Sequence, residues 1–545
     1  MMNRDYKKLQ NGSDIRGIAL TGVDGELPNL GEQEAANLAA GFLLWLSRKT
    51  EKEPKQLKIA IGSDPRLSGR DLLHGILHGI LPYGVTILNC GLASTPAMFM
   101  STVFPEFNCD GAIMITASHL PFNRNGFKFF DKKGGLDKKD IQQIIACAES
   151  DEQLKELGER VNKESTNLVQ DEKVYSSMKA DLMGAYCDFL KNKIKDGVKH
   201  QKCYETPLKG LKIVVDAGNG GGGFYATQVL EPLGADISAS QFLDPDGTFP
   251  NHAPNPEDKD AMKSVSMQVI ESGADLGLIF DTDVDRSSAV DHRGREISRN
   301  GIVAMAAALV AEDYPGTTVV TDSITSDQLT VFLENNLGLK HKRFKRGYKN
   351  VINEAVKLNA EGTDCQLAIE TSGHAALKEN HFLDDGAYLA TKIVIKAAKL
   401  ALEGKTLDSL ISTLEEPAEA LEIRLPITCE DFGTYGDKII EDLQLWASMK
   451  DCARRNEEGN IVPVEEEGCC LCHCGMSTAQ PNYEGVRVNF SKEHGDGWCL
   501  LRKSLHDPIM PLNIESNKAG GCGQIIEKLR PFLAAYKNLD ISKLI

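Results

Sequence analysis

The sequence lacks any apolar run long enough to cross a membrane. Its longest nearly unbroken apolar run, Ile302–Ala311, is far shorter than the roughly 20 residues that a membrane helix needs. The first ten residues, MMNRDYKKLQ, contain no apolar signal region. These absences predict a cytoplasmic protein, or an organellar one if a transit peptide is missing from this chain.

The chain also has too little positive charge for general binding to polyanions. Its 61 Lys and Arg are outnumbered by 78 Asp and Glu, which gives a net charge of −17. Such an acidic chain is unsuited to non-specific contact with nucleic acids or anionic membranes, and we exclude both as partners. An anionic small substrate would therefore need a local cationic pocket. We expect a monomer or a dimer.

Closely spaced cysteines are confined to one stretch. The 14 Cys are otherwise scattered singly, which predicts a reducing compartment in which free Cys serves as a small core residue. The exception is Cys469–Cys474, where one CxxC occurs and no second pair follows at zinc-finger spacing. We favour a loop of unpaired thiols over a metal site.

What the sequence does contain is a repeated order of apolar strand, polar turn and helix. The strands of this pattern include Lys58–Ile61, Lys212–Val215, Leu276–Phe280 and Thr318–Val320. Strands that alternate with helices predict mixed or parallel sheets covered by helices. The last section differs, because two short antiparallel strands and a closing helix are expected there, at Val486–Phe490, Trp498–Arg502 and Gln524–Tyr536.

A chain of 545 residues is too long for a single hydrophobic core. Polar, charge-rich stretches place boundaries near residues 205, 314 and 416. The resulting division has three α/β domains and an α+β domain, which cover residues 1–204, 205–313, 314–415 and 416–545.

The sharpest motif is Asp281-Thr282-Asp283-Val284-Asp285-Arg286, directly after the strand Leu276–Phe280. Three alternating carboxylates on one tight loop can direct their oxygens at a hard divalent cation, with Mg²⁺ preferred. A calcium EF-hand is excluded, because its sixth position needs Gly and its twelfth needs Glu, and Arg286 and His292 stand there. A phosphatase that forms an aspartyl phosphate stays open as a competitor.

A second motif, Thr116-Ala117-Ser118-His119, follows the apolar strand Ala112–Ile115, and Lys128 comes shortly after. Ligands bind at the carboxyl ends of strands in open α/β sheets. A hydroxyl there, beside an imidazole and an ammonium group, can carry chemistry. From this segment alone, a surface turn whose Ser bonds its own backbone is equally compatible.

A glycine run, Gly218–Gly223, matches the dinucleotide fingerprint G-x-G-x-x-G after a strand. A run of glycines also produces this match by accident, and the following PDGTFP at 245–250 weakens the nicotinamide interpretation. We favour a tight turn that needs positive φ angles.

Two further loops carry groups suited to a phosphorylated sugar. Glu370-Thr371-Ser372-Gly373-His374 offers a carboxylate, a hydroxyl and an imidazole for recognition of a polyol. In Arg502-Lys503-Ser504, two cations and a hydroxyl could hold a phosphate. A polar surface turn explains each loop nearly as well when it is taken alone.

Taken together, these loops resemble those of the α-D-phosphohexomutase family, which includes the phosphoglucomutases and phosphomannomutases. TASHLPFNRNGFK resembles the family's phosphoserine loop, DTDVDR its magnesium loop, ETSGH its sugar loop and RKSLHDP its phosphate loop. The resemblance covers nearly the whole chain and keeps the family's order of motifs. It implies four domains, three of them α/β sandwiches and the last a smaller α+β domain, around a central cleft.

The resemblance implies an isomerase of carbohydrate metabolism that interconverts hexose 1-phosphate and hexose 6-phosphate, with glucose or mannose as the sugar. Ser118 would carry the phosphoryl group, and a hexose 1,6-bisphosphate would serve as intermediate and activator. The implied metal is Mg²⁺ on Ser118, Asp281, Asp283 and Asp285. His119, Lys128 and Arg16 would take part in the chemistry, and the substrate would be held by Arg286, Lys349, Glu370, Ser372, His374, Arg502 and Ser504.

Two departures from the family pattern bear on substrate choice. Leu120 replaces the usual Asn of the phosphoserine loop, and Leu505-His506-Asp507 replaces the usual Gly-Thr-Glu of the phosphate loop. The alternatives are therefore a phosphoglucosamine mutase and a sugar-phosphate-binding homologue without activity.

Overall fold

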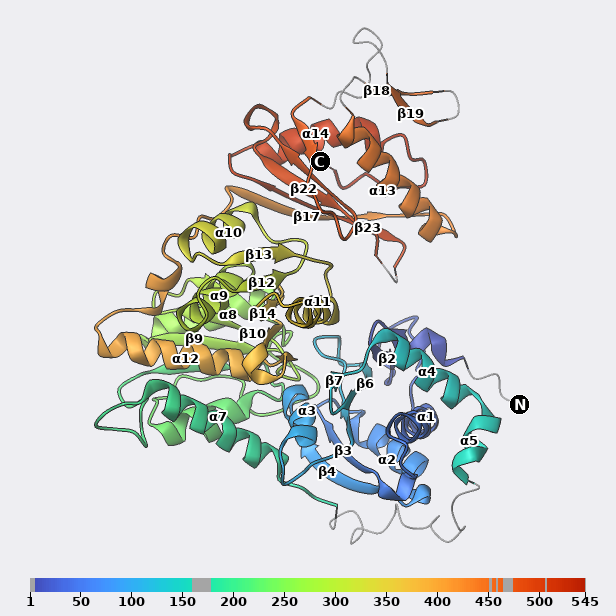
Figure 1. Ribbon diagram of the computed structural model, residues 1–545, viewed down its shortest axis with the longest axis vertical. Helices are drawn as coiled ribbons and strands as arrows, with labels where there is room; N and C mark the ends of the chain where they lie inside the picture. The colour runs from blue at the N-terminus through green and yellow to red at the C-terminus, as the bar shows by residue number, and fades with distance from the viewer. Residues whose placement is uncertain are drawn as a thin grey trace. The chain divides into compact units, whose positions relative to one another are not determined.

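The computed structural model describes residues 5–158, 178–449, 453–456, 459–463, 474–504 and 507–544. It divides into two compact units. Figure 1 colours the chain from blue at its N-terminus to red at its C-terminus. The first unit contains Met1–Val320 and Val351–Ser412, and the second contains Thr321–Asn350 and Thr413–Ile545.

The first unit begins with a sheet in the strand order β1-β2-β6-β5-β3-β4, with β7 beside β6. β3 is parallel to β4 and β5, whereas β6 is antiparallel to β5 and β2, so the sheet is mixed, as predicted. The strands are β1 Gln10–Asn11, β2 Asp14–Ile18, β3 Lys58–Ser63, β4 Thr86–Leu92, β5 Gly111–Ile115, β6 Arg124–Asp131 and β7 Gly134–Gly135.

The two faces of this sheet follow the alternation of side chains along each strand. Ile59, Ile113 and Phe127 belong to a core shared with helices on one face, and α3 (Thr95–Val103) lies on the other, as Figure 1 shows. Lys128 follows Phe127 and so points away from that core. The covering helices are α1 Glu32–Thr50, α2 Gly69–Ile80, α4 Lys138–Glu149 and α5 Asp151–Gly158.

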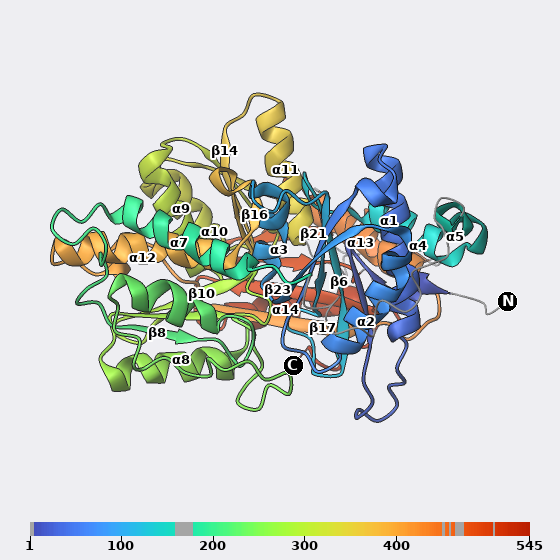
Figure 2. The ribbon, with the colours of Figure 1, turned by 90° about the horizontal axis from the view of Figure 1, so that it is seen from below.

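The second sheet has the order β11-β10-β9-β8. β8 and β9 are parallel, and β9 and β10 form an antiparallel pair that the Asp281–Arg286 loop connects. Figure 2 shows helix α8 on one face of this sheet and α12 on the other. The elements are β8 Ile213–Asp216, β9 Leu276–Phe280, β10 Ser287–Asp291, β11 Glu296–Ile297, α8 Lys259–Ser272 and α12 Gly386–Leu402.

In the third sheet, β12, β14, β15 and β16 follow one another as neighbours. The β14–β15 hairpin presents the Glu370–His374 loop, because Ile369 pairs with Ala375 directly beneath it. The apolar run Ile302–Ala311 lies in helix α9 and is largely buried. The bounds are β12 Thr318–Thr321, β14 Cys365–Ile369, β15 Ala375–Leu377, β16 Leu383–Asp384, α7 Leu182–Val198, α9 Asn300–Asp313 and α11 Tyr348–Ala360. In the part of the chain that the structure describes, no helix has both the length and the apolarity to cross a bilayer.

The second unit is built on an antiparallel sheet in the order β17-β23-β22-β21-β20. Its core is shared with α13 and α14, which lie on one face of the sheet in Figure 1. The elements are α10 Asp327–Val331, β13 Lys340–Arg343, β17 Glu419–Pro426, α13 Phe432–Ser448, β18 Ala453–Arg455, β19 Ile461–Pro463, β20 Met476–Thr478, β21 Val486–Phe490, β22 Gly497–Leu501, β23 Ile509–Ser516 and α14 Gly521–Leu533. The predicted antiparallel strands and closing helix are therefore found.

One side chain explains why residues 321–350 belong to this second unit. Arg487 on β21 donates to the carbonyl of Thr325 at 3.0 Å and to Asp327 Oδ1 at 2.9 Å. Its guanidinium also lies 3.6 Å from the centre of the Trp498 ring. A buried arginine with a carboxylate and an aromatic partner links the two segments firmly.

Candidate functional site

The site begins at the end of β5, where the chain turns sharply at Ser118. Ser118 is buried and has a φ of 50°, in the left-handed region that non-glycine residues seldom adopt. Its backbone N–H donates to Thr116 Oγ1 at 2.8 Å, which closes the turn. A strained residue of this kind persists only where its surroundings hold it, as they do at functional sites.

Arg66 makes many of the contacts that keep the Ser118 loop in this conformation. It follows β3, which is parallel to β5, so the two loops leave the same edge of the sheet. Its guanidinium donates to the carbonyls of Ser118 at 2.5 Å and Leu120 at 2.6 Å. It also donates to Pro121 at 2.7 Å, to Arg124 at 3.0 Å and to the Asp64 carboxylate at 3.2 Å. One buried cation therefore fixes the backbone of the whole Ser118 loop.

The three carboxylates of Asp281, Asp283 and Asp285 meet on the loop after β9. One oxygen from each lies within 4.8 Å of the others, and all three residues are buried. Val284 between them has a φ of 68°, which turns the chain so that the aspartates converge. Among the described residues, Asp283 Oδ1 and Asp285 Oδ1 have no hydrogen-bond partner. Buried oxygens without a donor fit a divalent cation, so the triad could hold a metal.

Lys128 brings a positive charge to the three anions from a distant part of the sequence. Its ammonium lies 2.9 Å from Asp283 Oδ2 and also pairs with Asp285. Although burial opposes ionisation, Lys128 holds the pKa of Asp283 and of Asp285 below the usual range. For Asp281, burial and the charge of Asp285 raise the pKa to about 8. Charge repulsion alone therefore does not require a metal here. The case for a metal rests on the two carboxylate oxygens that have no hydrogen-bond partner among the described residues.

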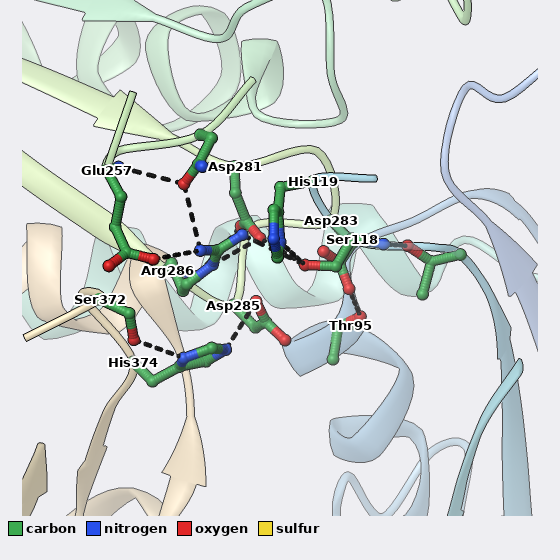
Figure 3. Close-up of polar contacts among 12 residues, drawn as sticks. Thr95, Ser118, His119, Glu257, Asp281, Asp283, Asp285, Arg286, Ser372 and His374 are labelled. Carbon is green, nitrogen blue, oxygen red and sulfur yellow. Dashed lines mark hydrogen bonds and ion pairs between the residues drawn. The ribbon is translucent and has the colours of Figure 1, made fainter. Parts of the chain in front are cut away.

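Ser118 lies directly against this triad, as Figure 3 shows. Its Oγ is 3.1 Å from Asp281 Oδ2 and 3.3 Å from Arg286 Nη2. Arg286 Nε donates to Asp281 Oδ2 at 3.0 Å, and its side chain is only 1% exposed. The His119 ring nitrogen Nδ1 lies 3.3 Å from the same hydroxyl. A carboxylate, a guanidinium and an imidazole therefore converge on the Ser118 hydroxyl.

The sugar-loop residues reach the same cluster through a contact between the second and third sheets. Arg286 and His374 form an isolated antiparallel bridge. Gly373 has a φ of 94°, and a Cβ on it would lie 2.6 Å from the Ser287 carbonyl, so only glycine fits this bridge. The bridge places His374 Nε2 3.6 Å from Asp285 Oδ1.

Within this loop the polar groups orient one another. His374 Nδ1 lies 2.9 Å from Ser372 Oγ and 3.5 Å from Glu370 Oε2. Despite the burial of the ring, the carboxylates of Asp285 and Glu370 raise the pKa of His374 to about 9. The loop therefore offers a cationic imidazole beside two acceptors.

Arg16 also lies in the first unit, on β2. Its guanidinium pairs with Asp14 at 2.7 Å and donates to the carbonyl of Thr116, so it binds the Ser118 turn from the side opposite Arg66. The first unit thus brings together most of the predicted site residues: Ser118, His119, Lys128, Arg16, Arg286, Glu370, Ser372, His374 and the three aspartates.

The remaining predicted residues belong to the second unit. Arg502 follows β22, and its Nη1 lies 4.0 Å from Glu484 Oε1. Ser504 Oγ accepts from the N–H of Asp507 at 3.2 Å. Lys349 lies in the first turn of α11. Leu505 and His506, which carry part of the family departure, are outside the described residues, as is the Cys469–His473 stretch, whereas Cys474 is exposed.

Sequence reasoning missed several residues that this geometry includes. Thr95, at the start of α3, donates its hydroxyl to Asp283 Oδ2 at 2.5 Å. Asp384 is buried, neither of its oxygens has a hydrogen-bond partner in the described part of the chain, and burial raises its pKa to about 7. Thr95 occupies an ordinary helix start, so no local signal distinguished it. Arg66, in the turn after β3, was likewise not expected to hold the Ser118 loop.

Three domain models of the phosphoglucomutase/phosphomannomutase family match this chain. The alpha/beta/alpha domain I model matches residues 7–155, the domain II model 185–294 and the domain III model 298–417. Together they cover well over half of the sequence. The chain belongs to this family.

Individual relatives agree with this assignment. A phosphoglucomutase from Neisseria gonorrhoeae is 28% identical over 484 residues, which are 88% of this chain and 90% of the relative. A phosphomannomutase/phosphoglucomutase from Pseudomonas syringae is 28% identical over 483 residues, or 88% of each. A solved family protein from Burkholderia thailandensis has the same fold, with a TM-score of 0.72, 23% identity and coverage of 98% of this chain and 99% of that one.

The predicted family and fold class are thereby confirmed: three α/β domains precede an additional C-terminal α+β part. Membership makes the chain a hexose-phosphate mutase, an isomerase of carbohydrate metabolism, as the four loops together predicted. The roles of individual residues stay predictions.

Proposed function

We propose that this mutase interconverts the 1-phosphate and 6-phosphate of glucose, mannose or both, through a phosphorylated Ser118. The observation that carries the proposal is the position of Ser118 Oγ, 3.1 Å from Asp281 Oδ2 and 3.3 Å from Arg286 Nη2. A phosphoryl group on that oxygen would be met by a guanidinium and by the carboxylates of a metal site. This is the arrangement that phosphoryl transfer requires.

The proposed metal is Mg²⁺, held by Asp281, Asp283 and Asp285 together with the Ser118 phosphate. When bound, it would neutralise charge on the phosphoryl oxygens, which lowers the barrier to transfer. The all-oxygen donor set and the two orphaned carboxylate oxygens support a hard divalent cation.

In the proposed reaction, a sugar hydroxyl attacks the phosphorus on Ser118. The bond from phosphorus to Ser118 Oγ breaks as the bond to the sugar oxygen forms, which leaves a bisphosphorylated sugar. After this intermediate reorients, its other phosphoryl group returns to Ser118, and the same hexose bisphosphate would act as activator of unphosphorylated enzyme. Arg286 would hold the travelling phosphoryl group throughout, and Arg16 would fix the turn that carries Ser118.

The proton of the attacking hydroxyl needs an acceptor beside Ser118. Lys128 pairs with Asp283 and Asp285, and these two charges outweigh its burial and raise its pKa well above the ordinary value, so its ammonium keeps its proton. His119 Nδ1 lies 3.3 Å from Ser118 Oγ, and burial lowers the pKa of His119 to about 2, so its neutral ring can accept the proton but is a weak base.

The sugar hydroxyls would be held by Glu370, Ser372 and His374, and the distant phosphate by Arg502 and Ser504, with Lys349 as a further contact. We retain the division into domains at residues 1–204, 205–313, 314–415 and 416–545 as part of the proposal, with a protein that is monomeric or dimeric. These assignments follow the order of the loops along the chain.

A coupled assay tests the function. The enzyme is supplied with glucose, mannose or glucosamine 1-phosphate, the corresponding hexose bisphosphate and Mg²⁺, and formation of the 6-phosphate is followed. Turnover of the glucose or mannose substrate supports the proposal, and turnover of the glucosamine substrate alone assigns a phosphoglucosamine mutase. Binding without turnover would indicate an inactive sugar-phosphate-binding homologue, and net release of inorganic phosphate would indicate the phosphatase.

A further inference from the structure

The outer glycines of the run Gly218–Gly223 face a segment of the chain to which the proposed reaction assigns no role. Gly218 has a φ of 52°, and a Cβ on it would lie 3.0 Å from Pro254 Cα and 3.1 Å from His252 Cε1. At the other end of the run, a Cβ on Gly223 would lie 2.2 Å from the Leu243 carbonyl. The two outer glycines are therefore needed because the chain's own 243–257 segment lies against them, where a dinucleotide would have to bind.

His252 fastens that segment to the sheet. Its Nε2 lies 3.0 and 3.1 Å from the two oxygens of Asp216, at the end of β8, and its Nδ1 lies 2.9 Å from the Ala253 carbonyl. Both ring nitrogens face acceptors, so both must carry a proton and the ring is an imidazolium. Its side chain is only 5% exposed, and that of Asp216 is fully buried.

The charges around this ring favour the same state. Asp216 and Asp258 are the titratable groups that face it, and Phe242 contributes only a ring edge. Burial opposes the charge of the ring, yet the carboxylate of Asp216 raises the pKa of His252 above its ordinary value. Asp216 also accepts from Gln241 Nε2 at 2.7 Å and from the N–H of Gly218 at 2.9 Å. The ring and carboxylate thus form a closed, satisfied network.

Immediately beyond His252, the same segment reaches the phosphoryl-transfer site. Asn255 Oδ1 accepts from Arg286 Nη1 at 3.2 Å and from the N–H of Glu257 at 3.0 Å. Glu257 Oε2 lies 3.7 Å from Arg286 Nη1. Figure 3 shows the Arg286 guanidinium between Glu257 and Ser118. The far side of the guanidinium, away from Ser118, is therefore held by the segment that His252 anchors.

We propose that His252 is a positioning residue for phosphoryl transfer: through its bond to Asp216 it fixes the 243–257 segment, whose Asn255 and Glu257 aim Arg286 at Ser118 Oγ. The inference rests on the proposed roles of Ser118 and Arg286. It also explains why glycine stands at Gly218 and Gly223, against which this segment packs.

The test uses His252→Gln, which keeps one donor toward Asp216, and His252→Leu, which keeps none. We expect kcat to fall about tenfold in the first and on the order of a hundredfold in the second, because a small misplacement of a group that holds the reacting phosphoryl is costly. KM for the 1-phosphosugar should change less than about threefold, because Arg286 acts on transfer more than on uptake. Thr248→Ala, an exposed change in the same segment, is the matched control and should leave both constants unchanged.

A purely structural role for His252 would be exposed by a cycle with Arg286→Lys. If His252 acts through Arg286, then His252→Gln should lower kcat in the wild-type background and have little further effect in the Arg286→Lys background. An equal fold-loss in both backgrounds overturns the proposal, as does an unchanged kcat in both His252 variants. Thermal unfolding of each variant identifies any that fail to fold, and His252→Gln keeps the test valid if His252→Leu is lost.

A second measurement does not depend on turnover. In selectively ¹⁵N-His-labelled Ser118→Ala protein, both ring nitrogens of His252, assigned by their loss in His252→Gln, should be protonated at pH 7. A single protonated nitrogen would overturn the bonding of the His252 ring to both Asp216 and the Ala253 carbonyl, on which the proposal rests. Retained turnover in Ser118→Ala would instead reject the proposed function, and the two failures are therefore distinguishable.

Discussion

The Ser118 cluster of the first unit and the phosphate loop of the second differ in how tightly their side chains are held. In the first, Arg286 and the aspartates are buried, and Arg66 alone makes five polar contacts beneath the Ser118 loop. In the second, Arg502 Nη1 lies 4.0 Å from Glu484 Oε1, and Ser504 Oγ accepts from the backbone N–H of Asp507 at 3.2 Å.

This difference matches the work that the two regions are proposed to perform. Phosphoryl transfer gains most from groups that are already in place when charge develops. A grip on the distant phosphate must accept and release the sugar in two orientations, so rigid neighbours would hinder it. We therefore expect changes in the first region to lower kcat and changes in the second to raise KM.

The largest effect is expected for Ser118→Ala, which removes the oxygen that carries the phosphoryl group. Turnover should fall on the order of a thousandfold or more, because the loss of a nucleophile leaves only binding and electrostatic contributions. Mass spectrometry should find no phosphoryl group on the variant after incubation with the bisphosphate. The matched control, Ser101→Ala, removes a buried hydroxyl bonded to the Met98 carbonyl and should retain activity. Unchanged turnover in Ser118→Ala would falsify the assignment.

A somewhat smaller effect is expected when the metal site is weakened. Chelation should abolish turnover reversibly, and Asp283→Asn should raise the Mg²⁺ concentration needed for half-maximal activity by at least about tenfold. The physical reason is the loss of one anionic ligand, which also removes one of the carboxylate partners of Lys128. Titration of activity with Mg²⁺ measures the shift, and Asp291→Asn on the same hairpin is the comparison variant. Activity that is indifferent to Mg²⁺ in both proteins would contradict the triad.

Arg66→Ala tests the hold on the Ser118 loop. It leaves four carbonyls without their donor and the buried Asp64 without its partner, a type of change that costs about 3–5 kcal/mol. We expect lower thermal stability of the first unit, and a fall in kcat that exceeds any rise in KM. Arg70→Ala, an exposed change in the first turn of α2, is the control. Loss of stability without loss of kcat would show that Arg66 supports the fold alone.

Sequence patterns predicted the local parts of this architecture well. The strand Leu276–Phe280 and its aspartate loop were found because an apolar run followed by alternating carboxylates is a short-range signal. Val284 shows the limit of that signal, because a β-branched residue does not itself favour the positive φ at which the chain turns between the aspartates. The antiparallel strand Val486–Phe490 was found with its bounds intact, since alternation and flanking turns mark it locally.

The missed residues share a different property, which is that their partners are distant in sequence. Thr95 meets Asp283 across 188 positions, and Arg66 meets the Ser118 loop across 52. Such contacts depend on how sheets and helices pack, so no window of sequence contains them. Lys128 is similar, because its pairing with two aspartates follows from the pleat of β6 and not from its neighbours. Family resemblance supplied what local physics did not.

The smallest predicted effects concern the second unit and complete the comparison. Arg502→Ala removes a charged donor to the distant phosphate, worth about 1.5–3 kcal/mol, and should raise KM roughly ten- to hundredfold. Ser504→Ala removes a neutral donor worth about 0.5–1.5 kcal/mol and should raise KM only severalfold.

In both variants kcat should change less than KM, in contrast to the first-unit variants. Arg424→Ala, an exposed arginine on β17, is the control for charge alone. If Arg502→Ala lowers kcat while KM stays constant, then the second unit also takes part in the transfer step, and the division of labour between the two regions is wrong.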